Sequence, residues 1–518
     1  MALVHDDALT FLDPIRIWKR SSSEFRMAFL TALVAGFLTH LYAFTNLLLS
    51  NDAVNNAFSS NEHLVSGRWA LGFFSSFSSY VQMPMIIGLL SVLALALTAG
   101  LTVRVLELHS TIGIMLTSIL LVTFPTVACT FAYMFTADAY FIALFFNAAA
   151  VYLTKRFRFG WIPAVLLIAV GCGIYQAYFN YAVTLFLLDC IFRLLQEADL
   201  KKTVILGLRY IAYLASSLLV YWAIQMILLR YHQETLTTYM GMDTIAGLNL
   251  LERLRALPKA YDIFRYYWSN WSFAIPIAKL FHWGIVAVLI GSVIYLLILK
   301  RVWIQPVRCI LILLGCALLP LTMNLSAALA YEGSVHRLMI YSFILLCVAG
   351  AKCAELVIAA GTGLSSVLSV TALLCCGVVA WNNFCLCNVG YHALTLNYEN
   401  TYAIAERVTV RLEELEGYEI GGPVAIVGYV SSDFYGTKSF YSPTFNTALN
   451  GEAIYEPLVY RSFFQYYIGF PIPSLTAEQR EFLNNSSEVA AMPAFPAKNS
   501  VAMINGIAVV KLGEGSIQ

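Results

Sequence analysis

The chain alternates between long apolar runs and short polar connections over most of its length. A helix needs about 20 apolar residues to cross the roughly 30 Å hydrocarbon core of a bilayer, and runs of that length recur through residue 384. The pattern predicts an all-α polytopic membrane domain over residues 27–384, with about eleven spanning helices. The expected spans are centred near Leu38, Leu93, Leu120, Phe145, Ile168, Phe186, Leu218, Val288, Leu314, Leu345 and Leu374.

One apolar run, residues 161–195, is too long for a single spanning helix. Gly171, Gly173 and Gln176 lie in its middle, where a polar turn would separate two shorter helices. We therefore expect two spans here, joined by a tight turn on the outward side.

Basic residues mark every second connection between the predicted spans. Short loops rich in Lys and Arg stay in the cytoplasm, so these connections are expected to be cytoplasmic, together with the N-terminal segment 1–26. An odd number of spans then leaves the chain beyond residue 384 on the opposite side. The residues that set this orientation are Lys19, Arg20, Arg26, Arg104, Lys155, Arg156, Arg158, Lys201, Lys202, Lys300, Arg301, Arg308 and Lys352.

The tail, residues 385–518, has the composition of a water-soluble domain. Its patterns predict a charged amphipathic helix near 401–415, a strand at 424–429 and a short helix at 477–483. A terminal hairpin of 501–505 and 507–512 is expected to turn at Asn505 and Gly506, a dipeptide that favours two-residue hairpin loops. The tail therefore predicts a small α/β extracytoplasmic domain.

Composition supports the membrane assignment and limits the classes of partner that we expect. Of 518 residues, 60% are hydrophobic and only 12% are charged, which is more apolar surface than one water-soluble core can bury. The net charge is +1 without a basic block, so we expect membrane lipids and no nucleic acid as partners. All eleven cysteines lie between Cys129 and Cys387, and we expect no disulfide framework in the tail.

The sequence contains no ligand spacing typical of a metal site, no glycine-rich phosphate loop and no Gly-x-Ser-x-Gly motif. We therefore predict no nucleotide-driven pump, no acyl-transfer enzyme and no metal ligands.

Two carboxylates lie on the outward side of the predicted spans. Asp52 directly follows the first span, in the loop that also contains Arg68 and Trp69, and Asp138 lies at the outer end of the fourth span. Ionisable groups at a membrane are costly unless they face a wet cavity, which makes both residues functional candidates. Asp also favours helix N-caps. The neighbouring residues favour the functional interpretation for Asp52, whereas both interpretations stay open for Asp138.

Three further ionisable residues, Glu332, His336 and Arg337, share a short outward loop before the tenth span. A guanidinium binds phosphate through two parallel hydrogen bonds, so Arg337 and Arg68 are candidates for binding a substrate phosphate. The alternative is that each anchors a helix to lipid head groups.

Two other polar groups have structural interpretations. Asp189 and Arg209 lie at similar depths in consecutive spans, which predicts an ion pair between two helices. The aromatic residues Tyr266, Tyr267 and Trp268, with Trp271, are typical of a belt at the membrane surface.

Several short motifs follow one another along the chain. They are Asn51-Asp52, Ser66-Gly67-Arg68-Trp69, Phe124-Pro125 with Tyr133 and Asp138, and Gly173-Ile174-Tyr175-Gln176. In these motifs and their order, the chain resembles the type II O-antigen glucosyltransferase (Gtr) family, within the GT-C superfamily. The likeness covers most of the membrane part and, more loosely, the tail with its closing segment 506–512.

The resemblance implies a GT-C-like fold and a reaction on the outer, periplasmic face of a bacterial inner membrane. The implied donor is undecaprenyl phosphate carrying glucose or a similar hexose, and the implied acceptor is O-antigen or a related surface polysaccharide. A separate donor-lipid synthase and a flippase are implied as working partners. No cofactor is implied with certainty, and a divalent cation is compatible with the chemistry.

The resemblance also implies roles for the candidate residues. The superfamily uses an acidic residue of the first outer loop as a general base, and Asp52 matches that position, with Asp138 as a second catalytic candidate. The remaining candidates are expected to bind the donor phosphate or other parts of the substrates. They are Arg337, Arg68, His336, Trp69, Glu332, Tyr175 and Gln176.

Two alternatives belong to other functional classes. A transporter or flippase for a lipid-linked sugar would also place polar residues between helices, but the sequence has no inverted repeat and few charges in the middle of its spans. A non-catalytic scaffold for polysaccharide assembly accounts for everything except the grouping of carboxylates and arginines.

Overall fold

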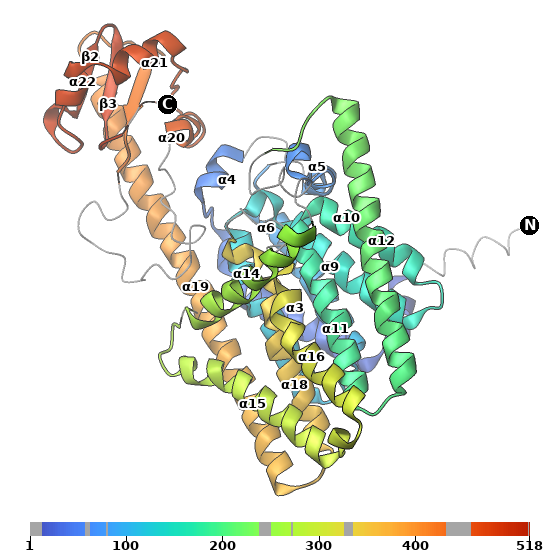
Figure 1. The fold of residues 1–518 in the computed structure, drawn as a ribbon. Helices are drawn as coiled ribbons and strands as arrows, with labels where there is room; N and C mark the ends of the chain where they lie inside the picture. Colours follow the sequence, from blue (N-terminus) through green and yellow to red (C-terminus); the bar gives the residue numbers. More distant parts are fainter. Residues whose placement is uncertain are drawn as a thin grey trace, which may run out of the picture.

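The computed structural model describes residues 13–56, 63–78, 81–237, 250–270, 273–325, 335–430, 457–515 and 517. Within these described residues, thirteen helices build a bundle that tapers away from a small sheet (Figure 1). They are α3 (Ser23–Thr45), α6 (Pro84–Val105), α7 (Thr111–Thr123), α8 (Pro125–Phe131), α9 (Met134–Arg156), α10 (Trp161–Ile174), α11 (Phe179–Leu195), α12 (Leu200–His232), α14 (Leu250–Ser269), α15 (Ala278–Leu299), α16 (Pro306–Met323), α18 (Ile344–Ile358) and α19 (Gly363–Glu413).

Shorter elements connect these helices and complete the C-terminal part. Before the sheet they are α2 (Pro14–Arg20), α4 (Asn51–Asn56), η1 (Leu64–Ser66), α5 (Leu71–Ser75), η2 (Ser76–Ser78), η3 (Gln176–Tyr178), η5 (Val302–Ile304), η6 (Arg337–Met339) and η7 (Tyr341–Phe343). The C-terminal part contains β1 (Val424–Val427), α20 (Pro457–Phe463), η8 (Phe464–Ile468), α21 (Ala477–Asn484), α22 (Ser487–Ala491), η9 (Lys498–Ser500), β2 (Val501–Ile504) and β3 (Ile507–Lys511).

The predicted all-α polytopic membrane fold is confirmed. Within the described residues, ten helical segments are long and apolar enough to cross a membrane, and α10 is a shorter apolar helix. Three of the ten segments combine neighbouring elements, namely α7 with α8, η3 with α11 and η7 with α18. The split of residues 161–195 is also confirmed, since α10 ends at Ile174 and α11 begins at Phe179 after a single 3-10 turn.

The last helix is longer than the sequence pattern predicts. Helix α19 has 51 residues and runs without a break through position 384, where the composition changes, to Glu413. At 1.5 Å per residue it is about 75 Å long, more than twice the roughly 30 Å hydrocarbon core. The predicted span near Leu374 and the predicted helix at 401–415 are therefore parts of one rod, which reaches from the bundle to the sheet (Figure 1).

Within the described residues, the C-terminal sheet has three strands in the order β1-β3-β2. Strand β1 is parallel to β3, with Val424 opposite Ala508, and β2 is antiparallel to β3, with Val501 opposite Val510. The predicted hairpin is present. Asn505 and Gly506 both have positive φ, at 48° and 75°, as a two-residue turn of this hand requires.

Both faces of this sheet are covered by helices, because side chains along a strand alternate between the two faces. Val424 and Ile426 of β1 pack on the α19 face, against a cluster that includes Val408 and Leu412. Ala425 and Val427 pack on the other face, with Leu483 of α21 and Val489 of α22. The sheet is therefore the middle of three layers.

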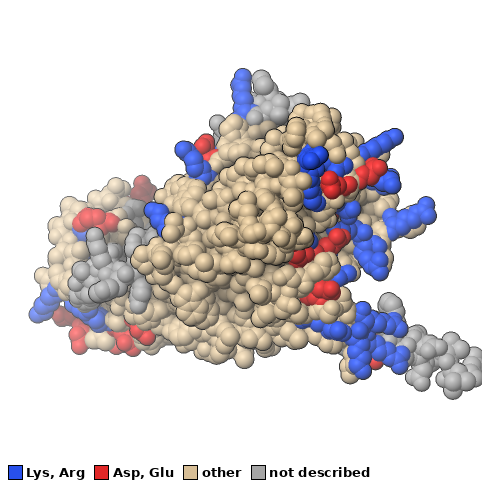
Figure 2. Space-filling view, turned by 90° about the horizontal axis from the view of Figure 1, so that it is seen from below, with Lys and Arg blue, Asp and Glu red and all other residues tan. Residues whose placement is uncertain are grey.

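At the end of the bundle far from the sheet, called here the basic end, Lys and Arg side chains join the connections between helices. Lys155 of α9 donates to the carbonyl of Val105 at 2.6 Å, and Lys352 of α18 donates to the carbonyl of Glu107 at 2.7 Å. Lys300 and Arg308 likewise donate to the carbonyls of Leu195 and Ala198. Basic connections that are far apart in sequence thus lie together at one end of the bundle. Viewed from below, the molecule has a broad area without charges, and Lys and Arg lie around its edge, most densely on one side (Figure 2).

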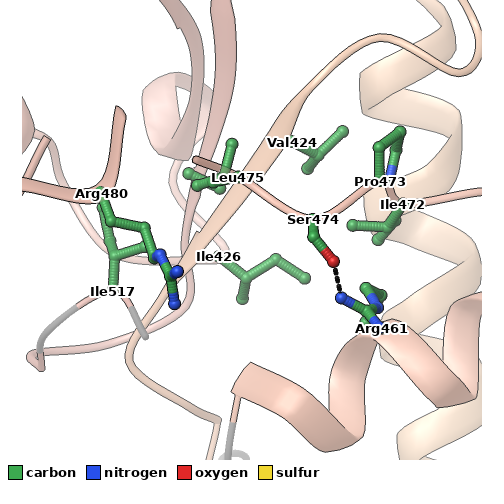
Figure 3. Close-up of a pocket in the computed structure, with 10 residues that line it drawn as sticks. Val424, Ile426, Arg461, Ile472, Pro473, Ser474, Leu475, Arg480 and Ile517 are labelled. Carbon is green, nitrogen blue, oxygen red and sulfur yellow. Dashed lines mark hydrogen bonds between the residues drawn. The ribbon is translucent and has the colours of Figure 1, made fainter. Parts of the chain in front are cut away.

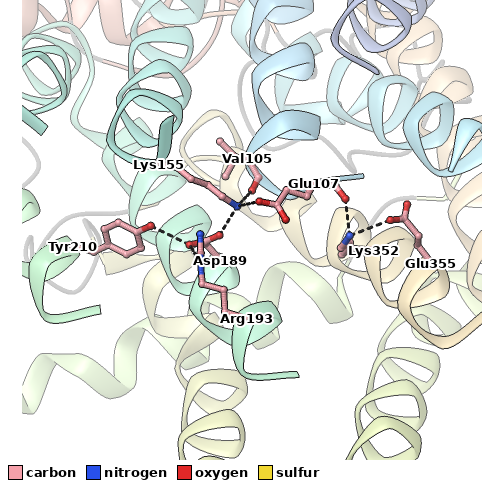
Figure 4. A network of polar contacts seen from close by, with 8 residues as sticks. All are labelled: Val105, Glu107, Lys155, Asp189, Arg193, Tyr210, Lys352 and Glu355. Carbon is pink, nitrogen blue, oxygen red and sulfur yellow. Dashed lines mark hydrogen bonds and ion pairs between the residues drawn. The ribbon is translucent and has the colours of Figure 1, made fainter. Parts of the chain in front are cut away.

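Asp189 is the centre of an ion-pair network at this end, but its partners differ from the predicted one. Its carboxylate accepts from Lys155 at 2.7 Å, from Arg193 at 2.8 Å and from the Tyr210 hydroxyl at 3.0 Å (Figure 4). The predicted pair with Arg209 is wrong. Arg209 is exposed, and the next residue along α12 turns toward Asp189.

We expect Asp189→Ala to lower the free energy of unfolding by about 3–5 kcal/mol, because it leaves the mostly buried Lys155 ammonium without its innermost counterion. Glu107→Gln is the matched control, since Glu107 also contacts Lys155, at 2.9 Å, but is 54% exposed. Its effect should stay within about 1 kcal/mol. Reversible unfolding in detergent measures both. Equal losses in the two variants would show that the network depends on its exposed partner as much as on the buried one.

Candidate functional site

The candidate residues gather at the other end of the bundle, called here the sheet end, where α4, the loop 63–70, the start of α9, η3 and η6 lie. Helix α4 carries Asp52 in its first turn, where a carboxylate is favoured by the helix dipole. The N-cap function belongs to Ser50, whose hydroxyl accepts from the Ala53 amide at 3.3 Å and donates to the Ala132 carbonyl at 2.7 Å. The capping interpretation of Asp52 is therefore wrong, and its side chain is exposed.

Asp52 acts electrostatically on His336, at the start of η6. Burial lowers the pKa of His336 below its ordinary value, and the charge of Asp52 offsets part of that shift. His336 is therefore mainly neutral near pH 7. The two predicted candidates, from loops almost 300 residues apart, face a common region.

Arg337 follows His336 and is held within the protein. It is 8% exposed, its Nη2 donates to the carbonyl of Asn270 at 3.3 Å, and its guanidinium lies 5.9 Å from the ring centre of Tyr267. Burial lowers the pKa of Arg337, but a guanidinium stays charged in proteins. A cation so enclosed is poorly placed to anchor a helix to bulk head groups.

The motif at Phe124 and Pro125 explains how η6 is fixed. Pro125 occupies the first position of α8 and interrupts the apolar segment between α7 and α8. One residue later, the Thr126 hydroxyl donates to the carbonyl of Arg337 at 2.9 Å. The hydroxyl of Tyr267 donates to the carbonyl of Val335 on the other side. Two side chains from different helices thus set the backbone that carries Arg337.

Gln176 and Tyr221 hold the loop that carries Arg68 and Trp69. Gln176 donates to the carbonyl of Ser66 at 3.0 Å, and the hydroxyl of Tyr221 donates to the carbonyl of Gly67 at 3.0 Å. Gly67 has φ 78°, which lets the chain turn and bridge His63 with Arg68. Gln176, predicted to bind substrate, therefore has a structural partner already.

Gly173 allows this loop to approach α10. A Cβ at position 173 would lie only 2.5 Å from Cε2 of Trp69, and the Ala70 amide donates to the Gly173 carbonyl at 2.8 Å. The indole Nε1 of Trp69 is buried and has no hydrogen-bond partner among the described residues. The two glycine-containing motifs, which are over 100 residues apart, are thus in direct contact.

Tyrosines connect Arg68 to the interior. Arg68 Nη1 donates to the Tyr140 hydroxyl at 3.2 Å, and the rings of Tyr140 and Tyr175 stack at 4.3 Å. Tyr178 lies 5.2 Å from Tyr175 and 6.0 Å from Tyr341, measured between ring centres. This tyrosine string, Tyr140, Tyr175, Tyr178 and Tyr341, joins the loop of Arg68 to the chain just after η6.

Most of the tyrosine string was missed by sequence reasoning, as were Tyr267 and Asn270, which hold Arg337. Tyr140 follows Asp138 by two residues, and Tyr178 follows Tyr175 by three, so their proximity to motif residues was a usable signal. Tyr341 lay inside an apolar run and gave none.

Asp138 differs from Asp52 in environment. It is 0% exposed in α9, and its Oδ1 accepts from the Ala139 amide at 2.8 Å. Its Oδ2 is buried, and the side chain of Ser78 interacts with the carboxylate. Helix α9 begins at Met134, so Asp138 lies in the second turn and the capping interpretation is wrong.

Two residues named from the sequence, Glu332 and Trp271, lie outside the described residues. Trp268 is 2% exposed and stacks on His282 at 4.0 Å, so the predicted aromatic belt is wrong for this residue. In the described part of the chain, no three His, Cys, Asp or Glu side chains come together as metal ligands would.

The C-terminal part contacts the helix of Asp52 directly. Ala53 and Val54 of α4 belong to one apolar cluster with Val459 and Phe463 of α20, and the same cluster includes Phe135 of α9. Helices α4 and α20 are neighbours in Figure 1 as well. The position of Asp52 therefore depends on residues more than 400 positions later.

Comparison with known families gives one match. The family described as Glucosyl transferase GtrII matches residues 41–347, more than half of the chain. The matched range includes α4, the loop 63–70, the start of α9 and η6, whereas α19 and the sheet lie beyond it. None of the curated proteins or solved structures compared with the chain matches it.

Proposed function

Since the chain belongs to the glucosyl transferase GtrII family, we propose that this membrane glucosyltransferase moves a hexose, glucose in the first instance, from undecaprenyl phosphate to O-antigen or a related surface polysaccharide. The observation that carries this proposal is the grouping of an exposed carboxylate, Asp52, with His336 and the enclosed guanidinium of Arg337 inside the matched range. The sheet end faces the periplasm and the basic end faces the cytoplasm, in line with the distribution of Lys and Arg.

Asp52 is the general base in this proposal. The acceptor hydroxyl oxygen attacks C1 of the hexose, the bond from C1 to the phosphate oxygen breaks, and the hydroxyl proton passes to the Asp52 carboxylate. The bonding electrons leave with undecaprenyl phosphate. Asp52 suits this role because it is exposed to an incoming hydroxyl, and a placed base contributes typically 10²–10⁴-fold to the rate.

Asp138 has a positioning role in this proposal. Its complete burial keeps it from a sugar hydroxyl, and its carboxylate accepts a backbone amide of α9, the helix that contacts α4. It acts on the reaction through the placement of α9 and α4.

Arg337 binds the leaving phosphate, whose charge grows as the hexose departs. Its position is fixed by Asn270 and the Tyr267 ring, so little reorganisation is needed when the charge develops. Neutral His336 supplies a hydrogen bond, and Arg68, above the Tyr175 ring at 5.6 Å, meets a second part of the donor or acceptor. Trp69, Tyr175 and Gln176 shape this second region, and Glu332 remains a predicted member of the site.

The proposed partners follow from the substrates. A separate synthase supplies the lipid-linked hexose and a flippase brings it to the periplasmic side. The alternative function, transport of a lipid-linked sugar, is tested by purified protein with polyprenyl-phosphoglucose and a polysaccharide acceptor. Product formed without any membrane gradient supports transfer, whereas movement of the donor without product supports transport.

We expect Asp52→Asn to fold normally and to reduce transfer at least about a hundredfold, because the amide keeps the shape but cannot take the proton. The control is Asp262→Asn, which removes another exposed carboxylate and should leave the rate unchanged. Transfer rates and melting temperatures of the purified variants measure this. Near-normal transfer by Asp52→Asn would remove Asp52 from the base role.

Arg337→Lys should reduce transfer at limiting donor by at least about tenfold, because Lys keeps the charge but loses the two-pronged contact with phosphate. Arg337→Ala should be slower still. His336→Gln retains a hydrogen-bond donor and should lose less than either variant. Steady-state rates at several donor concentrations separate the three, and a Lys variant equal to wild type would leave Arg68 as the phosphate ligand.

A reporter enzyme that is active only outside the cytoplasm, fused after Gln518, should be active. The same reporter fused after Asp199, at the basic end, should be inactive. The opposite pattern would reverse the proposed orientation of the whole bundle.

A further inference from the structure

The C-terminal part contains an open pocket beside the sheet. The pocket has about 150 Å³ of internal space. One wall is strand β1, with Val424 and Ile426, and another is the segment that precedes α21, with Pro473 and Ser474. It lies outside the matched family range, and none of its lining residues has a role in the reaction steps described above.

Two guanidinium groups border this pocket. Arg461 comes from α20 and Arg480 from α21, and Figure 3 shows them on opposite sides of Ile426. Arg461 donates to the hydroxyl of Ser474. The Arg480 side chain is exposed and makes no hydrogen bond or ion pair with any residue that the structure describes.

The lining is therefore positively charged and carries no compensating carboxylate among the described residues. Two guanidinium groups that border one small pocket favour an anionic ligand over a cationic one. A guanidinium binds a carboxylate or phosphate group through paired hydrogen bonds. The apolar side chains of Val424, Ile426 and Pro473 would pack against the non-polar part of the same ligand.

The pocket is linked to the helix that carries Asp52. Arg461 lies on α20 between Val459 and Phe463, which pack in one cluster with Ala53 and Val54 of α4. A ligand held by Arg461 is thus separated from α4 by a single short helix. Its position is on the side of the bundle where the sugar would be transferred.

We propose that this pocket is an acceptor subsite, which binds an oxyanion, a carboxylate or phosphate group, on the polysaccharide that receives the hexose. The inference rests on the proposed function, because it assigns the ligand as the acceptor of that reaction. It predicts that acidic polysaccharides bind to the C-terminal part through Arg461 and Arg480 and extend from there toward Asp52.

The test measures binding to the purified full-length protein in detergent. The probes are trigalacturonate, which has three carboxylates, and an uncharged galactose trisaccharide. Trigalacturonate should bind to the wild type. Arg480→Gln should weaken its affinity at least about tenfold, as expected for the loss of charge-assisted hydrogen bonds. The affinity of Arg480→Lys should lie between those of the wild type and Arg480→Gln, and any binding of the uncharged trisaccharide should be the same in all three proteins. Arg480 is exposed, so its replacement leaves the fold intact.

Matched controls separate the pocket from general charge effects and from the proposed chemistry. Lys498→Gln removes an exposed positive charge of the same domain outside the pocket and should bind trigalacturonate like wild type. Asp52→Asn should also bind it like wild type. A failure of the general-base proposal therefore appears in the transfer rate alone, and a failure of the pocket proposal appears in this binding measurement.

Short-chain phosphatidylglycerol, compared with phosphatidylcholine, tests a lipid head group as the source of the oxyanion. If Arg480→Gln weakens binding of phosphatidylglycerol and leaves that of trigalacturonate unchanged, the acceptor assignment is overturned. Equal binding of trigalacturonate to wild type, Arg480→Gln and Arg461→Gln would overturn the pocket itself.

Discussion

The requirement that polar groups be satisfied within the protein organises this structure. A bilayer core offers no hydrogen-bond partners, so charges either reach the ends of the bundle or pair inside it. At the basic end, Lys155, Lys300 and Lys352 donate to carbonyls of neighbouring connections and tie them together. At the sheet end, Arg68 and Arg337 are enclosed by tyrosines and carbonyl groups but keep their charge. The same requirement therefore ties connections together at one end and leaves enclosed cationic groups at the other.

Features that depend on local sequence pattern are predicted well. The rotation of a helix about its axis and the length of a continuous helix are predicted less well. The apolar runs predict the spans, and Asn505 with Gly506 predicts the hairpin turn. The ion pair of Asp189 was misassigned because equal depth in two helices does not determine which side chain faces the neighbour, and Tyr210 does so instead of Arg209. The length of α19 was underestimated because the end of a helix was predicted from a change from apolar to polar composition. Such a change indicates different surroundings, whereas the backbone hydrogen bonds of α19 continue across it.

The candidate site shows the same division. Order along the chain is enough to group Asp52, Arg68, Asp138 and Arg337 on one side of the bundle. It does not distinguish an exposed carboxylate from a buried one, and that difference separates Asp52 from Asp138. Nor does it reveal supporting residues such as Tyr267, whose hydroxyl fixes the backbone before Arg337 and whose ring lies beside the guanidinium.

The C-terminal part helps to position Asp52, which lies on α4 and outside that part of the chain. Helix α4 has six residues, too few to be stable alone, because helices shorter than about 12–15 residues are marginal in water. Its position depends on the contact of Ser50 with Ala132 and on apolar packing against α20. The C-terminal part is in turn attached through α19, where Arg411 donates to the carbonyls of Pro496 and Ala497. The C-terminal part is thus attached to the bundle through α19 and to α4 through α20, so the position of the Asp52 carboxylate and that of the C-terminal part depend on each other.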